Sequence, residues 1–112
     1  MAWEVEMLNG GAKALVRVEG VVDSTNVEEF FAFINSIFKK GVKRMVLDME
    51  NTSYLSSGGI SVIVDAYKKA EREGGRLVIA RASDMVVDLF RVAQIERIIP
   101  LFSTLEEALQ AL

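Results

Sequence analysis

The sequence predicts an α/β domain in which four helices accompany a five-stranded mixed sheet, in the order ββαβαβαβα. Two patterns lead to this fold class. The first two apolar segments alternate with polar residues and are joined by a glycine-rich turn, which is typical of an N-terminal β-hairpin. Further along the chain, helical stripes alternate with short apolar runs, which indicates a mostly parallel remainder. The length of 112 residues, 51% of them hydrophobic, fits a single domain spanning residues 1–112.

The hairpin is predicted from alternation on both sides of a turn. Residues 3–7 alternate apolar and acidic side chains, and the run of residues 13–19 sets Ala14, Val16 and Val18 against the charged residues Lys13, Arg17 and Glu19. Asn9-Gly10-Gly11 lies between these runs and supplies residues that tolerate positive φ, as a tight turn requires. The second run ends at Gly20, and residues 21–22 resume a brief extended stretch.

The first helix is predicted to begin at Thr25, because Thr25 and Glu28 have the spacing of a capping box. Gly41 ends it. Phe33 lies off the apolar stripe, where an exposed aromatic side chain marks either an interface or an ordinary surface. The stripe has i, i+3, i+4 spacing and consists of Val27, Phe30, Phe31, Ile34, Ile37 and Phe38.

The middle of the chain repeats this alternation. Residues 44–49 form an apolar run suited to a buried strand, and residues 50–55 are polar and are expected to be a loop. A second helix opens at residues 56–59 and closes at Gly74-Gly75. Residues 76–80 then give another buried strand.

The last third adds two helices and one strand. Ser83 is expected to cap the third helix. Residues 98–102 form a short strand, which Pro100 places at an edge because proline cannot donate to a ladder. Ser103 and Glu106 have the spacing of a second capping box, at the start of the fourth helix.

Composition excludes several classes of function. The chain has no Cys and no His, which removes disulfides, thiolate nucleophiles and the usual zinc sites and catalytic triads. A net charge of −3 with scattered basic residues argues against a nucleic-acid partner. No apolar run approaches a membrane span, and the N-terminus does not resemble a signal peptide. We therefore expect a cytoplasmic protein with no membrane partner, metal or cofactor.

One loop has a composition that suggests a function. Residues 51–59 follow the central strand and bring Ser57 to the first turn of the second helix, where unpaired N–H groups and the helix dipole favour a phosphoryl group. Three interpretations are open. The loop is a nucleotide-phosphate cradle, although the Walker pattern and its lysine are missing. Alternatively, Ser57 is itself phosphorylated, or Ser56 is merely an N-cap and the glycines merely allow a tight turn.

Two aspartates also follow strands. Asp48 is either a catalytic carboxylate or a group that ties a loop through backbone hydrogen bonds, and Asp23 is either a neighbour of a phosphate site or a turn residue. Even if the two lie close together as an acid/base pair, the sequence offers no nucleophile activator or metal ligand set beside them. We therefore expect no catalytic residues and no enzyme activity.

The central loop and its surroundings resemble the signature of STAS domains, whose stand-alone members are bacterial anti-sigma-factor antagonists. In that family, Leu-Asp-Leu is followed by a short loop, an apolar pair and Asp-Ser-Ser/Thr-Gly-Leu-Gly. The resemblance covers nearly the whole chain and implies a STAS-like fold. The segments that carry it are residues 20–23, 47–49, 53–62, 74–78 and 105–108.

The resemblance implies a partner switch. In the family, the unmodified antagonist binds an anti-sigma factor that is also a serine kinase, which frees the sigma factor. The kinase then phosphorylates the antagonist and the complex dissociates, and a serine phosphatase resets the cycle. Alignment places the phosphate acceptor on Ser57, with Ser56 as second choice. The surrounding partner-binding residues are then Asp23, Ser24, Ser56, Gly58, Gly59 and Ser61.

This chain departs from the family pattern at three positions. The motif Asp is Ser56, the following Ser/Thr is Gly58, and the second motif Gly is Ser61, one helical turn from Ser57. Two alternatives therefore stand beside the phospho-switch. One is a STAS component of another assembly, such as a stress-signalling complex or a lipid-transport subunit, that binds constitutively. The other is a small nucleotide-binding or hydrolytic domain. The family's stand-alone members suggest a monomer.

Overall fold

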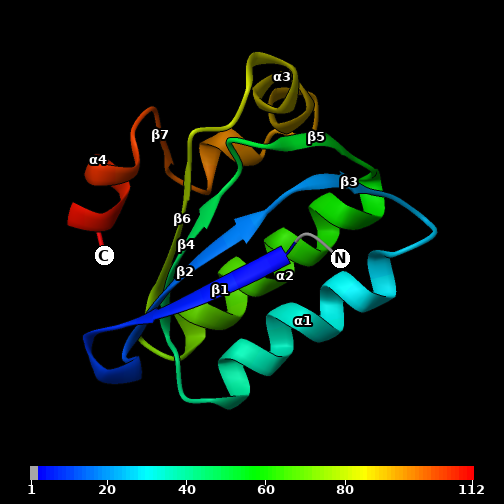
Figure 1. Ribbon diagram of the computed structural model, residues 1–112. Helices are drawn as coiled ribbons and strands as arrows, with labels where there is room; N and C mark the ends of the chain where they lie inside the picture. The colour runs from blue at the N-terminus through cyan, green and yellow to red at the C-terminus, as the bar shows by residue number, and fades with distance from the viewer. Residues whose placement is uncertain (1–2) are drawn as a thin grey trace.

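The fold is built on a five-stranded mixed sheet with the order β1-β2-β4-β6-β7 (Figure 1). The structure is a computed structural model and describes residues 3–112. Strands β1 (Trp3–Leu8) and β2 (Lys13–Val18) form the predicted antiparallel hairpin. Strands β4 (Arg44–Asp48), β6 (Arg76–Ala80) and β7 (Leu101–Phe102) are parallel to β2. The predicted fold class is confirmed. The terminal strand lies at an edge as predicted, but it covers only two of the expected residues 98–102.

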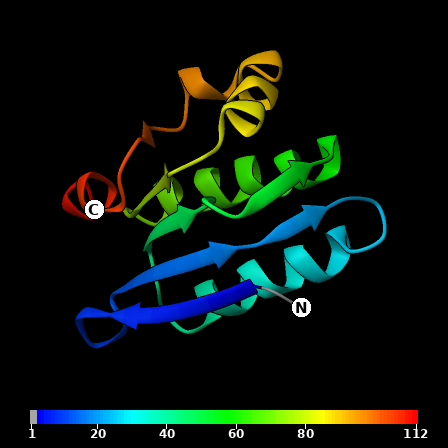
Figure 2. The same cartoon turned by 45° about the horizontal axis from the view of Figure 1, so that its top comes forward.

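A second, two-stranded parallel sheet was not predicted. It pairs β3 (Gly20–Val22) with β5 (Thr52–Leu55), and Figure 2 shows these strands continuing the lines of β2 and β4. The expectation of a loop is therefore wrong for residues 52–55, whereas residues 50–51 do form a turn. The strand forms because Thr52 and Leu55 are buried, and the Thr52 hydroxyl donates to the Val18 carbonyl. Only the two middle residues of β5, Ser53 and Tyr54, carry the exposed side chains that suggested a loop.

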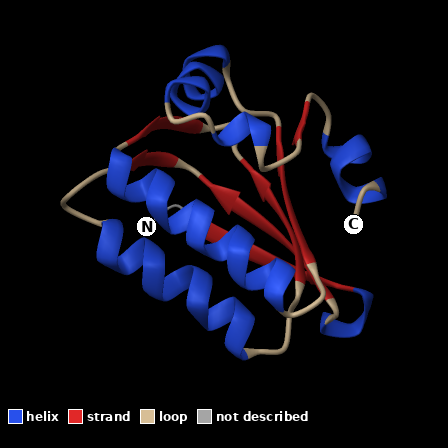
Figure 3. Cartoon of the chain, turned by 180° about the vertical axis from the view of Figure 1, so that it is seen from behind, coloured by secondary structure: helices blue, strands red, loops and turns tan. Residues whose placement is uncertain are grey.

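Helices cover both faces of the large sheet (Figure 3). Helices α1 (Val27–Lys39) and α2 (Ser57–Arg72) pack on one face, and their apolar stripes join the main core together with α3 (Asp84–Val92). Helix α4 (Leu105–Gln110) covers the opposite face, where Ala108 packs against side chains of β2, β4 and β6. A short 3-10 turn, Ile95–Arg97, follows α3 and buries Ile95. Among residues 3–112, no helix combines the length and apolar character needed to cross a membrane.

The predicted helix starts are correct for α2 and α3 and are shifted for α1 and α4. Ser83 caps α3 by accepting a hydrogen bond from the Val86 N–H, as predicted. At α4 the capping box is formed by Thr104 and Glu107, one residue later than expected. At α1 the N-cap position is Asn26 and no side chain caps the helix there, because the Thr25 hydroxyl donates to Asp23 instead.

The aromatic residues of α1 also differ from the prediction. Phe33 packs against Trp3, with ring centroids 5.9 Å apart, because edge strand β1 lies over that side of the helix. Phe31, which the apolar spacing placed in the core stripe, is 49% exposed. The strand partner therefore shifts the buried stripe around the helix by part of a turn.

The connection between α2 and β6 requires a glycine at residue 75. A Cβ atom on Gly75 would lie 1.8 Å from the Lys43 carbonyl oxygen, which accepts a hydrogen bond from the Arg76 N–H. We expect Gly75→Ala to lower the free energy of unfolding by about 2–3 kcal/mol, since the backbone must move to relieve the overlap. Urea denaturation of the purified chain measures this.

Gly74→Ala is the matched control, because Gly74 has a φ of +77° but open space around its Cβ position. The control should cost about 1 kcal/mol, from backbone strain alone. An equal loss in the two variants would contradict the steric explanation.

Candidate functional site

The candidate site lies where β5 leads into α2, at the carboxyl ends of the strands. Ser56 is the N-cap of α2, with extended backbone (φ −73°, ψ 169°), and its Oγ accepts from the Gly59 N–H at 3.2 Å. Its own N–H donates to the Val22 carbonyl at 2.8 Å. Ser56 is therefore held from both sides, and the N-cap interpretation is correct for this residue.

Ser57 has a different environment. It is the first residue of α2 and is exposed, and among residues 3–112 its hydroxyl makes no hydrogen bond. The two adjacent hydroxyls therefore differ: one is used to start the helix, and the other is presented to solvent at the positive end of the helix dipole.

The glycines after Ser57 allow α2 to begin close to two neighbouring elements. A Cβ on buried Gly59 would lie 3.0 Å from a methyl group of Val22 in β3. A Cβ on Gly58 would lie 3.4 Å from a methyl group of Val27, the first residue of α1. The start of α2 thus contacts both the strand and the helix that flank the Asp23 turn.

Residues 23–26 form a tight, hydrogen-bonded turn beside the start of α2. The Asp23 carboxylate accepts from the Thr25 hydroxyl at 2.5 Å and from the Thr25 N–H at 2.9 Å. These two hydrogen bonds hold the pKa of Asp23 below the ordinary value for an aspartate. Asn26 completes the turn by bonding to the Asp23 N–H and the Val21 carbonyl. Asp23 is therefore a turn residue, and it lies next to exposed Ser24.

A shallow groove of about 330 Å³ begins at Ser57 and runs between α2 and the end of α3. Ser61 lines it beside Ser57, as their spacing predicted. The remaining lining is one carboxylate, Asp65, and apolar groups that the sequence did not single out: Ile60, Val64, Ala93 and Ile95. We call this the Ser57 groove. Its lining includes no Lys or Arg, so no cation of this chain stands ready to pair with a phosphate there.

Asp48 ties a loop and does not belong to the Ser57 groove. It is 4% exposed, and its two carboxylate oxygens accept from the Arg81 guanidinium at 2.6 and 3.2 Å. One of these oxygens also accepts from the Glu50 N–H. The hydrogen bond from Arg81 to Asp48 raises the pKa of Arg81, so the guanidinium stays charged. Arg81 has a φ of +59°, and nothing in the sequence spacing marked it as the partner of Asp48.

The two aspartates do not form an acid/base pair. The carboxylate of Asp23 bonds to Thr25, and that of Asp48 bonds to Arg81 and Glu50. Within residues 3–112, no cluster of three or more metal-ligating side chains is present. The site therefore consists of a free hydroxyl, an apolar groove and a rigid turn, which is an arrangement suited to contact with another molecule.

The structure thus shows a small α/β domain that presents an exposed serine at the start of a helix, beside a strand-turn-helix segment. The STAS domain family matches residues 4–108. The chain therefore belongs to the STAS domain family.

Similar proteins agree with this assignment. BtrV of Bordetella bronchiseptica, a proposed anti-sigma factor antagonist, is 31% identical over 94 residues, which cover 84% of this chain and 81% of that protein. A crystal structure of a proposed anti-sigma factor antagonist from Thermotoga maritima has a TM-score of 0.89 at 16% identity and covers 97% of this chain and 92% of that one.

The Bacillus anti-sigma factor antagonist SpoIIAA is similar in two forms. Its unphosphorylated form has a TM-score of 0.83 at 23% identity, covering 98% of this chain and 95% of that one. Its phosphorylated form has a TM-score of 0.75 at the same identity, covering 98% of both chains. These similarities confirm the fold.

The different roles of the adjacent serines can be tested by the free energy of unfolding of two variants. Ser56→Ala removes the cap of α2 and should lower the free energy of unfolding by about 1 kcal/mol. Ser57→Ala should change it by less than about 0.5 kcal/mol, because that hydroxyl is exposed and unbonded. Urea denaturation of both variants gives the two values. A larger loss in Ser57→Ala than in Ser56→Ala would contradict the assignment of the cap.

The Asp23 turn should respond to pH. A carboxylate whose pKa is lowered on folding stabilises the fold above its unfolded pKa, and this contribution is lost as pH falls through the lower folded pKa. Thr25→Val removes the hydroxyl donor and should raise the pKa of Asp23 toward its ordinary value. A carboxyl-detected NMR titration of both chains measures this pKa. An unchanged pKa in Thr25→Val would show that the hydroxyl is not the cause.

Proposed function

We propose that this chain is an anti-sigma factor antagonist whose binding to a partner is controlled by phosphorylation of Ser57. The observation that carries the proposal is the exposed, unbonded hydroxyl of Ser57 at the first residue of α2. In the STAS signature this position is the phosphate acceptor. The partner in this proposal is an anti-sigma factor with serine kinase activity, and a serine phosphatase restores the unmodified state.

The local geometry favours Ser57 over Ser56 as the acceptor. A kinase needs a hydroxyl that it can reach and orient, and the Ser56 oxygen already accepts the Gly59 N–H inside the cap. Modification of Ser56 would remove this hydrogen bond and destabilise the start of α2. Modification of Ser57 breaks no contact of the described chain.

Phosphorylation would act on the partner and leave the fold intact. A phosphoserine adds about 1.5 to 2 negative charges at pH 7, and a helix N-terminus accommodates them. Because the Ser57 groove offers Asp65 and no cation, the phosphate would remain solvated on this chain. A partner docked on the apolar lining would then have to bury an unpaired dianion, which is costly. The names of similar proteins, and the two forms of SpoIIAA, support this mode of regulation.

Ser56 is the observation that favours a second candidate. It replaces the motif aspartate and so removes one negative charge beside the acceptor. A STAS domain that binds its partner constitutively, inside a larger assembly, would not need that charge. The two candidates share the same surface and differ only in whether Ser57 is modified.

The test is phosphorylation by the anti-sigma kinases of the host. Each kinase is incubated with the chain and ATP, and the modified residue is mapped by mass spectrometry. We expect modification at Ser57, loss of it in Ser57→Ala, and retention of it in Ser56→Ala as the matched control. Ser57→Asp should weaken kinase binding about a hundredfold, which corresponds to ~3 kcal/mol.

Other outcomes separate the candidates. Binding to a kinase without modification, and with equal affinity for Ser57→Asp, would favour the constitutive module. Modification that persists in Ser57→Ala and disappears in Ser56→Ala would assign the acceptor to Ser56. Nucleotide turnover by the isolated chain, abolished by Asp48→Asn, would instead point to a hydrolytic domain.

A further inference from the structure

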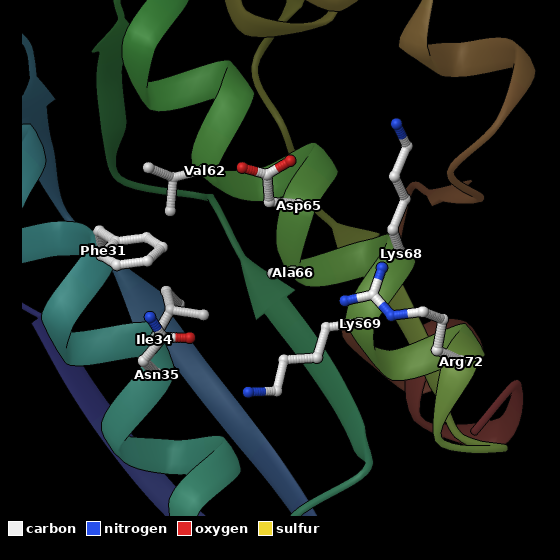
Figure 4. A pocket seen from close by; sticks show the side chains of 9 residues that line it. All are labelled: Phe31, Ile34, Asn35, Val62, Asp65, Ala66, Lys68, Lys69 and Arg72. Atoms are coloured by element: carbon white, nitrogen blue, oxygen red, sulfur yellow. The ribbon is translucent and has the colours of Figure 1, made fainter.

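A second groove lies between α1 and α2, away from Ser57 (Figure 4). Its volume is about 350 Å³, similar to that of the Ser57 groove. Helices α1 and α2 run in the same direction (Figures 1 and 3), and residues of both helices line the groove. We call it the α1–α2 groove.

The floor of the α1–α2 groove is apolar. Ile34 of α1 and Val62 and Ala66 of α2 form it, and each is less than one tenth exposed. Phe31 of α1 lies beside this floor (Figure 4), and its side chain is 49% exposed. An apolar side chain of another molecule would find apolar contacts with this floor and with the Phe31 ring.

The end of the groove nearest the helix C-termini is cationic. Lys68, Lys69 and Arg72 of α2 line it, and none of them forms an ion pair within residues 3–112. Lys69 reaches toward α1, where its ammonium group lies 5.3 Å from the centroid of the Phe38 ring. Cations in the last turns also offset the helix dipole. The dipole does not account for the exposed Phe31 or for the apolar floor beside these charges.

The positive charge of this groove contrasts with the chain as a whole. The net charge is −3, yet the lining carries three cations against the single carboxylate of Asp65. Asp65 lies near the middle of α2, on the N-terminal side of these three cations, and lines both grooves. Lys69 and Arg72 therefore attract the carboxylates of a ligand, and Asp65 repels them. A ligand with carboxylates at one end would bind with that end at the cations.

We propose that the α1–α2 groove binds an acidic amphipathic helix of a partner protein. An apolar side chain of that helix packs on Phe31 and Ala66, and its carboxylates pair with Lys69 and Arg72. A helix fits because two parallel helices leave a groove along their axes, in which a third helix lies with its apolar face inward. The combination of an apolar floor and unpaired cations favours this occupant over a simple anion, which would make no use of the floor.

The cationic end of the α1–α2 groove is remote from Ser57, the proposed phosphorylation site. Ser57 and Arg72 stand at opposite ends of the 16-residue helix α2 and are about 22 Å apart along its axis. This separation exceeds the Debye length of about 8 Å at physiological ionic strength, so a charge on Ser57 would be largely screened from Lys69 and Arg72. Binding there is therefore expected in either state of Ser57.

The experiment uses two designed helical peptides of about 18 residues with the same leucine stripe, one with glutamates and one with lysines on the polar face. Each is titrated into the full chain labelled with ¹⁵N. The acidic peptide should shift the amide signals of α1 and α2 around Phe31 and Lys69, with a Kd of about 10–100 µM. The lysine peptide should bind at least tenfold more weakly.

Variants assign the binding to the groove. The double change Lys69→Glu and Arg72→Glu should lower the affinity for the acidic peptide at least tenfold. Phe31→Ser should also lower this affinity. Arg91→Glu with Arg97→Glu is the matched control, since it makes the same change of charge at exposed residues that do not line the α1–α2 groove. That control and Ser57→Asp should both bind as the unchanged chain does.

Four results would overturn the proposal. If the lysine peptide binds as tightly as the acidic peptide, charge does not determine binding. If the Lys69→Glu, Arg72→Glu variant binds the acidic peptide as tightly as the unchanged chain, the binding site lies elsewhere. Equal shifts from an acidic peptide without leucines, from ATP, or from phosphatidylglycerol vesicles would identify a general anion site. The absence of shifts at about 1 mM acidic peptide would show that the groove does not bind such a helix.

Discussion

The site depends on one contact, between β3 and the start of α2. The Ser56 N–H donates to the Val22 carbonyl at 2.8 Å, and Gly59 approaches Val22 so closely that a Cβ there would lie 3.0 Å from its methyl group. This contact brings two segments that are some 30 residues apart in the sequence onto one surface. The Asp23 turn thereby lies beside Ser57, and the hydroxyl is presented from a rigid base.

Much of the fold could be predicted because its signals are local. Alternation and the Asn9-Gly10-Gly11 turn predict the hairpin, and each of these three residues does have positive φ. The predictions fail where a distant partner decides the outcome. Residues 52–55 look like a loop until β3 pairs with them, and Phe33 looks exposed until Trp3 of the edge strand covers it. Helix starts shift by a residue where several neighbouring side chains can all act as caps, as at Thr104.

The position of the site could be predicted from the sequence, but the different roles of its two adjacent serines could not. Ser56 and Ser57 are chemically identical neighbours, and only the backbone geometry shows that one caps α2 while the other faces solvent. Asp48 presents the opposite case. Its ambiguity is resolved by Arg81, which lies 33 residues away and reaches it through an unusual backbone conformation. Neither the roles of the two serines nor the pairing of Asp48 with Arg81 can be inferred from the spacing of residues.

Helix α2 separates two kinds of charge along its length. Its N-terminus carries Ser57, where a phosphate is compatible with the helix dipole, and its C-terminal turns carry Lys69 and Arg72. The distance of about 22 Å between these ends exceeds the Debye length of about 8 Å at physiological ionic strength. A phosphate on Ser57 would therefore be largely screened from the cations of the α1–α2 groove. Under the two proposals, a single rigid helix can release one partner at its start while it holds another near its end, with no conformational change between them.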